Sequence, residues 1–282
     1  MENRILIDRN QIAKRFKPRP DDAHKGTLGH ALIVAGSYGK IGAAVLSAKA
    51  AMHAGCGLVT AYLPKCGYDI MQTSIPEVMI ITDDDAEIIT SINPAINYQS
   101  IAIGPGIGTN SPTQKALLEF LKQINKPLVL DADALNIIAM SPSEISIPEN
   151  SIVTPHAKEL ERLVGSFQNE AEKLAIASAF SIQHNVIVVV KGSPTYIIDK
   201  HAIYRNTTGN SALATAGSGD VLTGIIAGLL AQQYSSLDAT LIAVYLHGLS
   251  ADIAVAETSR EAFVASDIIK YLGRAFRSLA QK

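Results

Sequence analysis

The chain has 282 residues, of which 48% are hydrophobic and 18% charged, so it can bury a large core as one domain or as two small ones. Its formal net charge of -2 provides no strongly basic surface, and the composition therefore does not favour a nucleic-acid partner. Cys56 and Cys66 are the only cysteines and form no C-x-x-C pair, which indicates a reduced, cytoplasmic protein without a disulfide framework.

The N-terminal part of the sequence does not resemble a targeting segment. Residues 1–9 place charges on both sides of only three apolar residues, which is not the pattern of a secretory signal. The Ala-rich run from Ile41 to Leu63 is interrupted by Lys49, His53 and two glycines, so it is a poor membrane span. The sequence therefore predicts no membrane partner.

Short apolar segments alternate with helical segments along the chain. The predicted strands are residues 31–35, 58–63, 78–81, 101–103, 128–130, 152–153 and 186–190, followed by a hairpin of 196–198 with 202–204. The predicted helices are residues 42–54 and 113–124, and the chain from residue 217 to the end reads as helical. Short, fully apolar strands between helices are typical of a parallel sheet covered on both faces. No linker or repeat interrupts the pattern, so residues 1–282 predict a single doubly wound α/β domain.

Glycine-rich blocks follow several of these strands, where ligands bind in such sheets. Residues 36–42 read G-x-x-G-x-x-G, and residues 104–108 read G-x-G-x-G, so neither matches the dinucleotide fingerprint G-x-G-x-x-G of hydride-transferring enzymes. No P-loop motif occurs, which excludes that class of nucleotide hydrolase. Structural glycines in tight turns are the alternative interpretation of each single block.

The most informative segment is Gly217-Ser218-Gly219-Asp220, which runs into an apolar helical stretch. The free amides and partial positive charge of a helix N-terminus can hold a phosphoryl group. We expect a Cβ at Gly219 to intrude on that group or to forbid the required dihedral angles. Asp220 lies at the mouth of this cradle, where it can take a proton from an attacking hydroxyl. Asp220 could instead simply cap the helix, because Asp is a favoured N-cap.

This segment resembles the anion hole and catalytic aspartate of the ribokinase-like superfamily, most closely its vitamin-kinase branch. Six further blocks in order resemble the nucleotide-dependent NAD(P)H-hydrate dehydratase family: residues 25–30, 34–37, 42–44, 104–108, 131–136 and 154–156. The resemblance spans Lys25 to the C-terminus and implies one ribokinase-like domain. Since about 25 residues precede Lys25, we expect no fused epimerase domain and action on a single epimer.

The resemblance places the substrate against Ala43, Gly106, His156 and Asp220. Vitamin kinases commonly read Thr-Pro-Asn where this chain has Thr154-Pro155-His156, and a histidine there is similar to the hydrate dehydratases. His156 could instead only cap the helix that begins near residue 157. By the kinase analogy, Glu159 could hold magnesium through water; it could equally be a first-turn acid favoured by the helix dipole.

The nucleotide is assigned by the resemblance to a second group of residues: Lys191, Gly192, Ser193, Pro194, Thr195, Gly209, Asn210 and Gly219, with Asn206 and Thr208 nearby. Lys191 can offset phosphate charge. Asp131 and Asp133 follow a predicted strand, and each could contact a ligand, support another side chain or cap the next helix.

The implied reaction is dehydration of the S-epimer of NADH hydrate or NADPH hydrate to the reduced coenzyme, with ADP or ATP as phosphoryl donor and Mg²⁺ as cofactor. The amides of Gly217, Ser218 and Gly219 would stabilise the transferred group, and Asp220 would be the base. The resemblance also implies a homo-oligomer, with a homotetramer as a candidate form. A vitamin-type kinase and a non-catalytic nucleotide sensor are the alternatives; the intact Asp220 disfavours the sensor.

Overall fold

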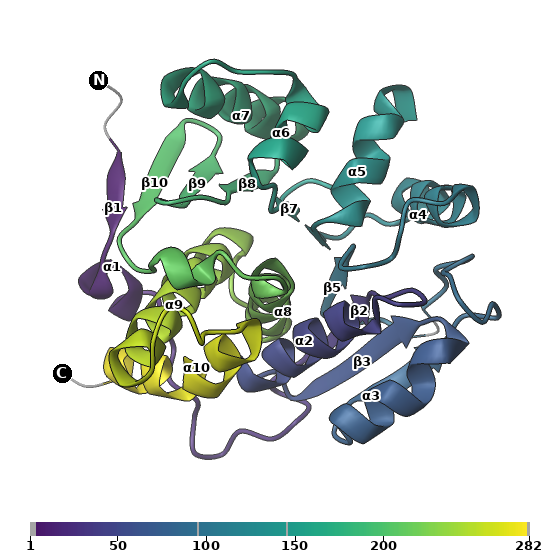
Figure 1. Cartoon of the computed structure of the whole chain (residues 1–282), viewed down its shortest axis with the longest axis horizontal. Helices are drawn as coiled ribbons and strands as arrows, with labels where there is room; N and C mark the ends of the chain where they lie inside the picture. Colours follow the sequence, from purple (N-terminus) through teal and green to yellow (C-terminus); the bar gives the residue numbers. More distant parts are fainter. Residues whose placement is uncertain (1–3, 95, 145, 281–282) are drawn as a thin grey trace.

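The computed structural model describes residues 4–94, 96–144 and 146–280. Its centre is one ten-stranded sheet in the order β1-β10-β9-β8-β7-β6-β5-β2-β3-β4 (Figure 1). The strands are β1 (Ile5–Ile7), β2 (His30–Val34), β3 (Leu58–Leu63), β4 (Met79–Thr82), β5 (Ser100–Ile103), β6 (Val129–Leu130), β7 (Ile152–Val153), β8 (Ile187–Val190), β9 (Tyr196–Asp199) and β10 (Ala202–Asn206).

The sheet is mostly parallel, as the sequence predicts. Strands β4, β3, β2, β5, β6, β7 and β8 pair in parallel in their spatial order, and the β9–β10 hairpin adds to β8 in antiparallel fashion. The carboxyl ends of seven strands therefore meet at one edge of the sheet. The functional residues predicted after β5, β6, β7 and β8 are gathered at this edge.

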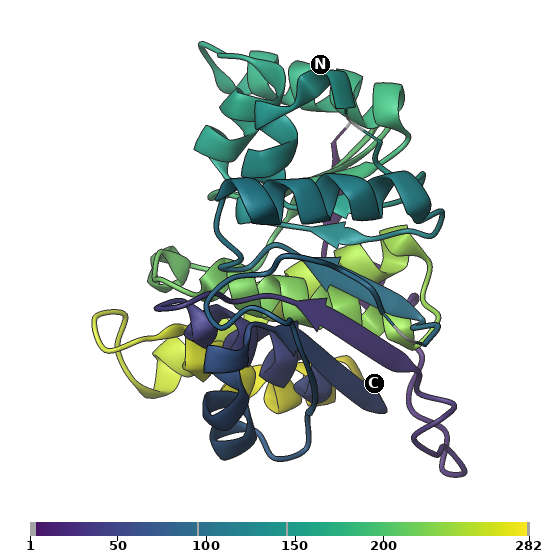
Figure 2. The same ribbon diagram turned by 90° about the vertical axis from the view of Figure 1, so that its right-hand side faces the viewer.

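Helices cover both faces of the sheet (Figure 2). The helices are α1 (Arg9–Ala13), α2 (Ile41–His53), α3 (Tyr68–Ser74), α4 (Ser111–Gln123), α5 (Asp133–Met140), α6 (Ala157–Val164), α7 (Glu170–His184), α8 (Ser218–Ala231), α9 (Ser236–Glu257) and α10 (Ala265–Ala280), with short 3₁₀ turns η1 (Lys65–Gly67), η2 (Pro142–Glu144) and η3 (Ser211–Leu213). Core residues of α2, α8, α9 and α10 pack on one face, and those of α4, α5, α6 and α7 pack on the other. The doubly wound α/β prediction is confirmed.

The apolar strands are buried on both sides, which is why their sequences do not alternate between apolar and polar residues. In β2, Ala31 and Ile33 belong to the core under α8, whereas Leu32 and Val34 belong to the core under α4. All four side chains are 0% exposed. A continuous apolar run is the pattern expected of a parallel strand with helices on both faces.

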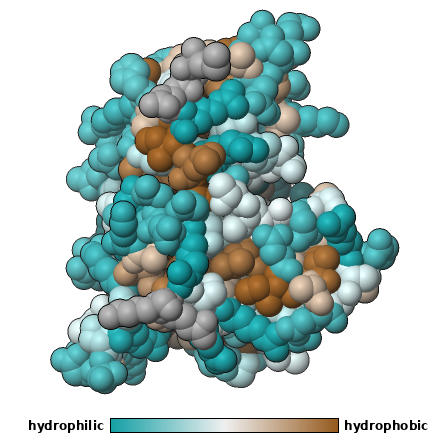
Figure 3. Space-filling view, turned by 90° about the vertical axis from the view of Figure 1, so that its left-hand side faces the viewer, coloured by the Kyte–Doolittle hydropathy of each residue, from teal (hydrophilic) through white to brown (hydrophobic). Residues whose placement is uncertain are grey.

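Strand β1 is absent from the sequence prediction. Ile5–Ile7 pairs in parallel with β10, and its short length gives little periodic signal. Ile5 and Leu6 remain 42% and 51% exposed at this edge of the sheet. Figure 3 shows the face that carries β1, where apolar patches lie within a hydrophilic surface.

Within the part of the chain that the structure describes, α9 alone is long and apolar enough to cross a membrane by length and composition. However, 72% of its apolar window is buried inside the protein, as in the core helix of a globular domain.

Candidate active site

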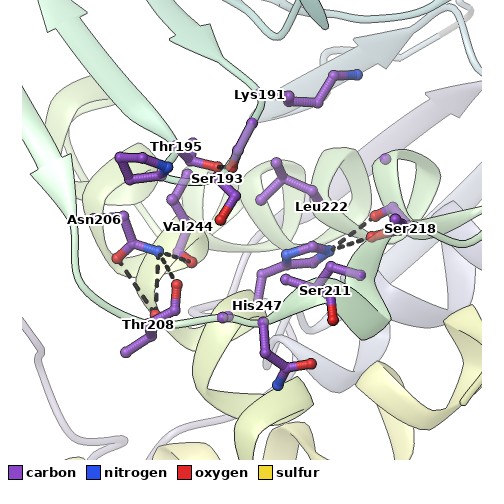
Figure 4. A pocket seen from close by; sticks show the side chains of 18 of the residues that line it. Lys191, Ser193, Thr195, Asn206, Thr208, Ser211, Ser218, Leu222, Val244 and His247 are labelled. Carbon is purple, nitrogen blue, oxygen red and sulfur yellow. Dashed lines mark hydrogen bonds between the residues drawn. The ribbon is translucent and has the colours of Figure 1, made fainter. Parts of the chain in front are cut away.

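A cavity of about 780 Å³ opens between the carboxyl end of β8, the segment after β10 and the N-terminus of α8 (Figure 4). Every residue predicted for the nucleotide lines this cavity: Lys191, Gly192, Ser193, Pro194, Thr195, Gly209, Asn210 and Gly219. Ser218 and His156 also line it. The topology thus brings three segments that are distant in sequence around one space.

The N-terminus of α8 has the form expected of an anion cradle. Gly217 precedes the helix with φ of 87°, a left-handed conformation, and no side chain caps the helix. A Cβ on Gly217 would lie 2.5 Å from Leu46 Cδ1, so the position favours glycine sterically as well. By helix geometry the first amides lack intrahelical acceptors. Ser218 N makes only a long bond to Thr215 O, at 3.4 Å, so this end of the helix can still turn donors toward a ligand.

Two details of the sequence interpretation change here. Asp220 is the third residue of α8 and not its N-cap, so the capping alternative is wrong. Gly219 lies inside the helix and does not have positive φ, so its dihedral angles do not require glycine. A Cβ on Gly219 would lie 3.3 Å from Lys191 Nζ. A side chain here would therefore crowd the charged groups and a bound ligand, and would not strain the backbone.

Asp220 is half-buried among charged neighbours. Burial raises the pKa of its carboxyl to about 6, with the nearby charge of Asp131 acting in the same direction. Lys191 opposes this shift, and Asp133 and Glu159 add to it. A carboxylate whose pKa lies near the working pH is suited to accept a proton from a hydroxyl group.

Lys191 and Asp131 form a partly buried ion pair beneath the cradle. Lys191 Nζ donates to Asp131 Oδ1 at 2.8 Å and lies 3.7 Å from Glu159 Oε2. Asp131, 1% exposed, also accepts from Thr223 Oγ1 of α8 at 2.7 Å. Burial lowers the pKa of Lys191, but Asp131 and Glu159 raise it more, so the pKa is raised on balance and the lysine stays charged. This pair connects β6, β8 and α8 at the site.

Asp133 points to a different part of the site than Asp131. Strand β6 ends at Leu130, and Asp133 is the first residue of α5, whose N-cap is Ala132 without a side-chain bond. Asp133 Oδ2 accepts from Gly108 N at 2.9 Å and lies 3.6 Å from Lys40 Nζ. Asp133 therefore fixes the glycine-rich loop after β5, and neither aspartate is an N-cap.

His156 caps α6, as the alternative interpretation expected. Its Nδ1 accepts from Glu159 N at 3.2 Å, and a Glu159 carboxylate oxygen accepts from His156 N at 2.8 Å, which completes a capping box. The exposed His156 side chain also borders the cavity. Capping and ligand contact are thus compatible for this residue, because the cap uses Nδ1 while the exposed ring borders the cavity; its Nε2 lies 3.5 Å from Glu159 Oε1.

Ala43 and Gly106, the other residues predicted for the substrate, lie beside each other outside this cavity. A Cβ on Gly106 would lie 3.1 Å from the Ala43 Cβ, and Ser37 Oγ donates to Gly106 O at 2.7 Å. Nearby on the same helix, Ser47 Oγ donates to Asp220 O at 2.9 Å. The α2 side of the site is therefore joined to α8 at Asp220.

Sequence reasoning missed the contribution of α9. His247, 8% exposed, places Nε2 2.9 Å from Ser218 O and 3.3 Å from Ser218 Oγ (Figure 4). Since a carbonyl only accepts, Nε2 carries the proton. Burial lowers the pKa of His247 to about 4, so the ring is neutral. The signal available in the sequence was a histidine, His247, in the mostly apolar middle of this helix.

No group of three or more His, Cys, Asp or Glu that could hold a metal ion occurs in residues 4–94, 96–144 and 146–280. Glu159 has its carboxylate in the capping box and near Lys191. The residues present therefore do not form a protein cage for Mg²⁺, but they leave room for an ion carried by nucleotide phosphates, the usual form of Mg²⁺ in such sites.

Comparison with known proteins gives a consistent family. A family model described as NAD(P)H-hydrate dehydratase matches residues 31–274. An ADP-dependent (S)-NAD(P)H-hydrate dehydratase of Neisseria meningitidis is 39% identical over 249 residues, covering 84% of this chain and 81% of the relative. A bifunctional NAD(P)H-hydrate repair enzyme of Moorella thermoacetica is 34% identical over 99% of this chain. The chain spans about half the length of the bifunctional relatives it matches.

Solved structures agree with this match. The ADP/ATP-dependent NAD(P)H-hydrate dehydratase of Bacillus subtilis, co-crystallised with ATP and Mg²⁺, is 29% identical with a TM-score of 0.87, covering 99% of this chain and 100% of the other. A hydroxyethylthiazole kinase of Pyrococcus horikoshii has a TM-score of 0.62 at 15% identity, covering 90% of this chain and 92% of that one, which is a likeness of fold alone.

Proposed function

Because the chain belongs to the NAD(P)H-hydrate dehydratase family, we propose that it dehydrates the S-epimer of NADH hydrate or NADPH hydrate, with ADP or ATP as phosphoryl donor. The observation that carries the proposal is the position of Asp220: a half-buried carboxyl with a pKa raised to about 6, in the first turn of a helix whose N-terminus faces a nucleotide-sized cavity.

The first step is phosphoryl transfer. Asp220 takes the proton of the hydroxyl at C6 of the hydrated nicotinamide ring while that oxygen forms a bond to the terminal phosphorus of the nucleotide. The bond between this phosphorus and its bridging oxygen breaks, so ADP leaves as AMP, or ATP as ADP. The amides at Gly217, Ser218 and Gly219 stabilise the charge on the transferred group, and Lys191 offsets the charge of the nucleotide.

The second step is elimination. Hydroxide is a poor leaving group, whereas phosphate is a good one. The lone pair of the ring nitrogen forms a double bond to C6 as the C6–O bond breaks and phosphate departs with its electron pair. Loss of a proton from C5 then restores the C5–C6 double bond of the reduced coenzyme. The products are NADH or NADPH, phosphate, and AMP or ADP.

In this proposal two sets of residues bind the two ligands separately. The nucleotide occupies the cavity lined by Lys191 to Thr195, Gly209 and Asn210. The hydrate lies toward Ala43, Gly106 and His156, so Asp220 stands between the two ligands. Mg²⁺ would accompany the phosphates, with Glu159 contacting it through water, and would supply charge neutralisation.

The test is a mixture of purified protein, Mg²⁺, NADH hydrate and either ADP or ATP. We expect recovery of the absorbance of reduced nicotinamide together with one phosphate for each coenzyme molecule. Parallel reactions with NADPH hydrate and with each nucleotide show which hydrate and which phosphoryl donor the protein prefers. Accumulation of a phosphorylated vitamin from hydroxymethylpyrimidine, a thiazole alcohol or pyridoxal, without recovery of the coenzyme, would establish the vitamin-kinase alternative.

We further propose that the protein acts as a homo-oligomer, with a homotetramer as the candidate form, and that it works in the cytoplasm. The free thiols of Cys56 and Cys66 support a reducing compartment. Light scattering of the purified protein tests the assembly, and fractionation of cells tests the location.

A further inference from the structure

The residues proposed for the nucleotide in the segment after β10 have no regular structure of their own. Asn206 ends β10, and Thr207–Asn210, which we call the nucleotide loop, connects it to η3. Gly209 has φ of 99°, a conformation that is open to glycine and strained for other residues. What fixes the loop is its contact with α9.

Asp252 of α9 bonds two adjacent residues of the nucleotide loop. Its Oδ2 accepts from Gly209 N at 2.8 Å, and its Oδ1 accepts from Asn210 Nδ2 at 2.8 Å. Asn210 Oδ1 in turn accepts from Ala212 N at 3.0 Å and caps η3. One carboxylate thus fixes both the backbone and the side chain of this part of the loop, and charged acceptors make the stronger hydrogen bonds.

Two further contacts hold the loop on the same helix. Thr208 Oγ1 donates to Tyr245 O at 2.8 Å. Gly248 lets the loop backbone lie directly on α9, because a Cβ there would be 2.7 Å from the Thr208 carbonyl carbon and 2.8 Å from Gly209 N. The loop therefore lies in a groove made by the missing side chain of Gly248 and is fastened at Asp252.

These contacts leave Asp252 in an unusual electrostatic position. It bears a negative charge next to residues that line a cavity for an anionic ligand, which by itself opposes nucleotide binding. Its bonds also occupy the Gly209 amide, which is then no longer a donor for the nucleotide. Since neither effect helps the nucleotide to bind, we look for the benefit of Asp252 in the way it fixes the conformation of the loop.

We propose that Asp252 is a positioning residue for nucleotide binding: it holds the nucleotide loop in its binding conformation before the ligand arrives. The inference rests on the proposed function, since it takes the cavity as a nucleotide site. A loop ordered in advance loses less conformational entropy when the ligand binds, and affinity rises accordingly.

The experiment measures ADP binding by titration calorimetry, without turnover. Asp252→Ala removes both bonds, whereas Asp252→Asn keeps an acceptor for Gly209 N but faces Asn210 Nδ2 with a second donor. We expect ADP to bind about tenfold more weakly to Asp252→Ala, with a smaller loss for Asp252→Asn. The loss should come with a less favourable binding entropy, because the loop now becomes ordered on binding.

Two further variants separate this role from a general effect on folding. Asp238→Asn removes the same charge near the start of α9, where Asp238 bonds Ser235, pairs with Arg15 and does not line the cavity; its ADP affinity should equal that of the native chain. Gly248→Ala leaves both Asp252 bonds chemically possible but pushes the loop off α9, since its Cβ would collide with Thr208 Oγ1, and it should also weaken ADP binding. Melting curves confirm that each variant is folded at the temperature of titration.

Native affinity and native binding entropy in a folded Asp252→Ala variant would overturn the inference. Weaker ADP binding with an unchanged binding entropy would also overturn it, since the loss would then not reflect loop order. If the native chain bound ADP but regenerated no coenzyme, the proposed function would fail while the Asp252 comparison remained valid. If the native chain bound neither ADP nor ATP, both the proposed function and the role of Asp252 would be wrong.

Discussion

Replacing Asp220 by Asn should make the protein more stable while it destroys activity. Burial and the charge of Asp131 raise the pKa of Asp220 from its ordinary 3.8 to about 6, so the folded chain holds the ionised carboxyl at an energetic cost near neutral pH. A shift of about 2 pKa units corresponds to about 3 kcal/mol, the largest gain that an isosteric neutral residue can give. For a chain of this size we expect a rise in melting temperature of roughly 5 °C.

The pH dependence follows from the direction of the shift. Below about pH 4 the carboxyl is protonated in both the folded and the unfolded chain, so Asn and Asp should be equally stable. Between about pH 4 and 6 the folded chain binds a proton that the unfolded chain has lost, and native stability decreases as the pH rises. The advantage of Asp220→Asn should therefore grow over this range and stay constant above it.

The assay is denaturant unfolding of both proteins at several pH values, combined with steady-state rates. Loss of the base should lower the rate by about 10²–10⁴, and the native rate should fall about tenfold per pH unit below pH 6. Asp238→Asn is the control: it removes a carboxylate that pairs with Arg15 and accepts from Ser235 Oγ, so it should give no gain in stability. If Asp220→Asn were no more stable than the native chain at pH 7.5, the ionised Asp220 carboxylate would not destabilise the folded protein.

Four other substitutions examine separate parts of the site. His156→Asn keeps a good N-cap for α6 but removes the imidazole; calorimetry should show weaker hydrate binding and unchanged ADP binding, and an equal loss for both ligands would contradict the substrate role. Gly219→Ala should lower the rate strongly with little change in melting temperature, whereas Gly217→Ala should also destabilise the fold, because its φ is 87° and its Cβ would meet Leu46. Lys191→Met should weaken nucleotide binding and move the acid limb of the pH–rate profile to higher pH, since its charge lowers the pKa of Asp220; an unmoved limb would argue against their coupling.

The sheet could be predicted from sequence because its central strands are buried on both faces. Runs such as residues 186–190 are uniformly apolar, and their bounds in the structure differ by at most a residue or two. Strand β1 could not be predicted in this way, because three residues carry almost no periodic signal and its pairing with β10 depends on contacts about 200 residues away.

The residues that we assign to the nucleotide were chosen through resemblance, and in the structure they line one cavity, but their contacts with α9 were not predicted. His247 contacts Ser218 and Asp252 contacts Asn210, and each partner lies far away in sequence. The apolar sequence of α9 predicts that the helix is buried, but it does not show which of its polar side chains contacts which loop. The two interpretations of His156 could not be separated either, since capping depends on backbone geometry that the residue type does not reveal.

The pairing of β1 with β10 has a consequence for the order of folding. Ile5 pairs with Tyr204, so β1 leaves the ribosome about 200 residues before β10, the strand with which it pairs in the described structure. At bacterial and eukaryotic rates of synthesis this delay is roughly 10–40 s. Throughout it the segment Ile5–Ile7 stays unpaired, while β2 to β5 can already associate. Closure of this edge should therefore be a late event, and truncation before residue 202 should leave the N-terminal strand open to proteases and chaperones.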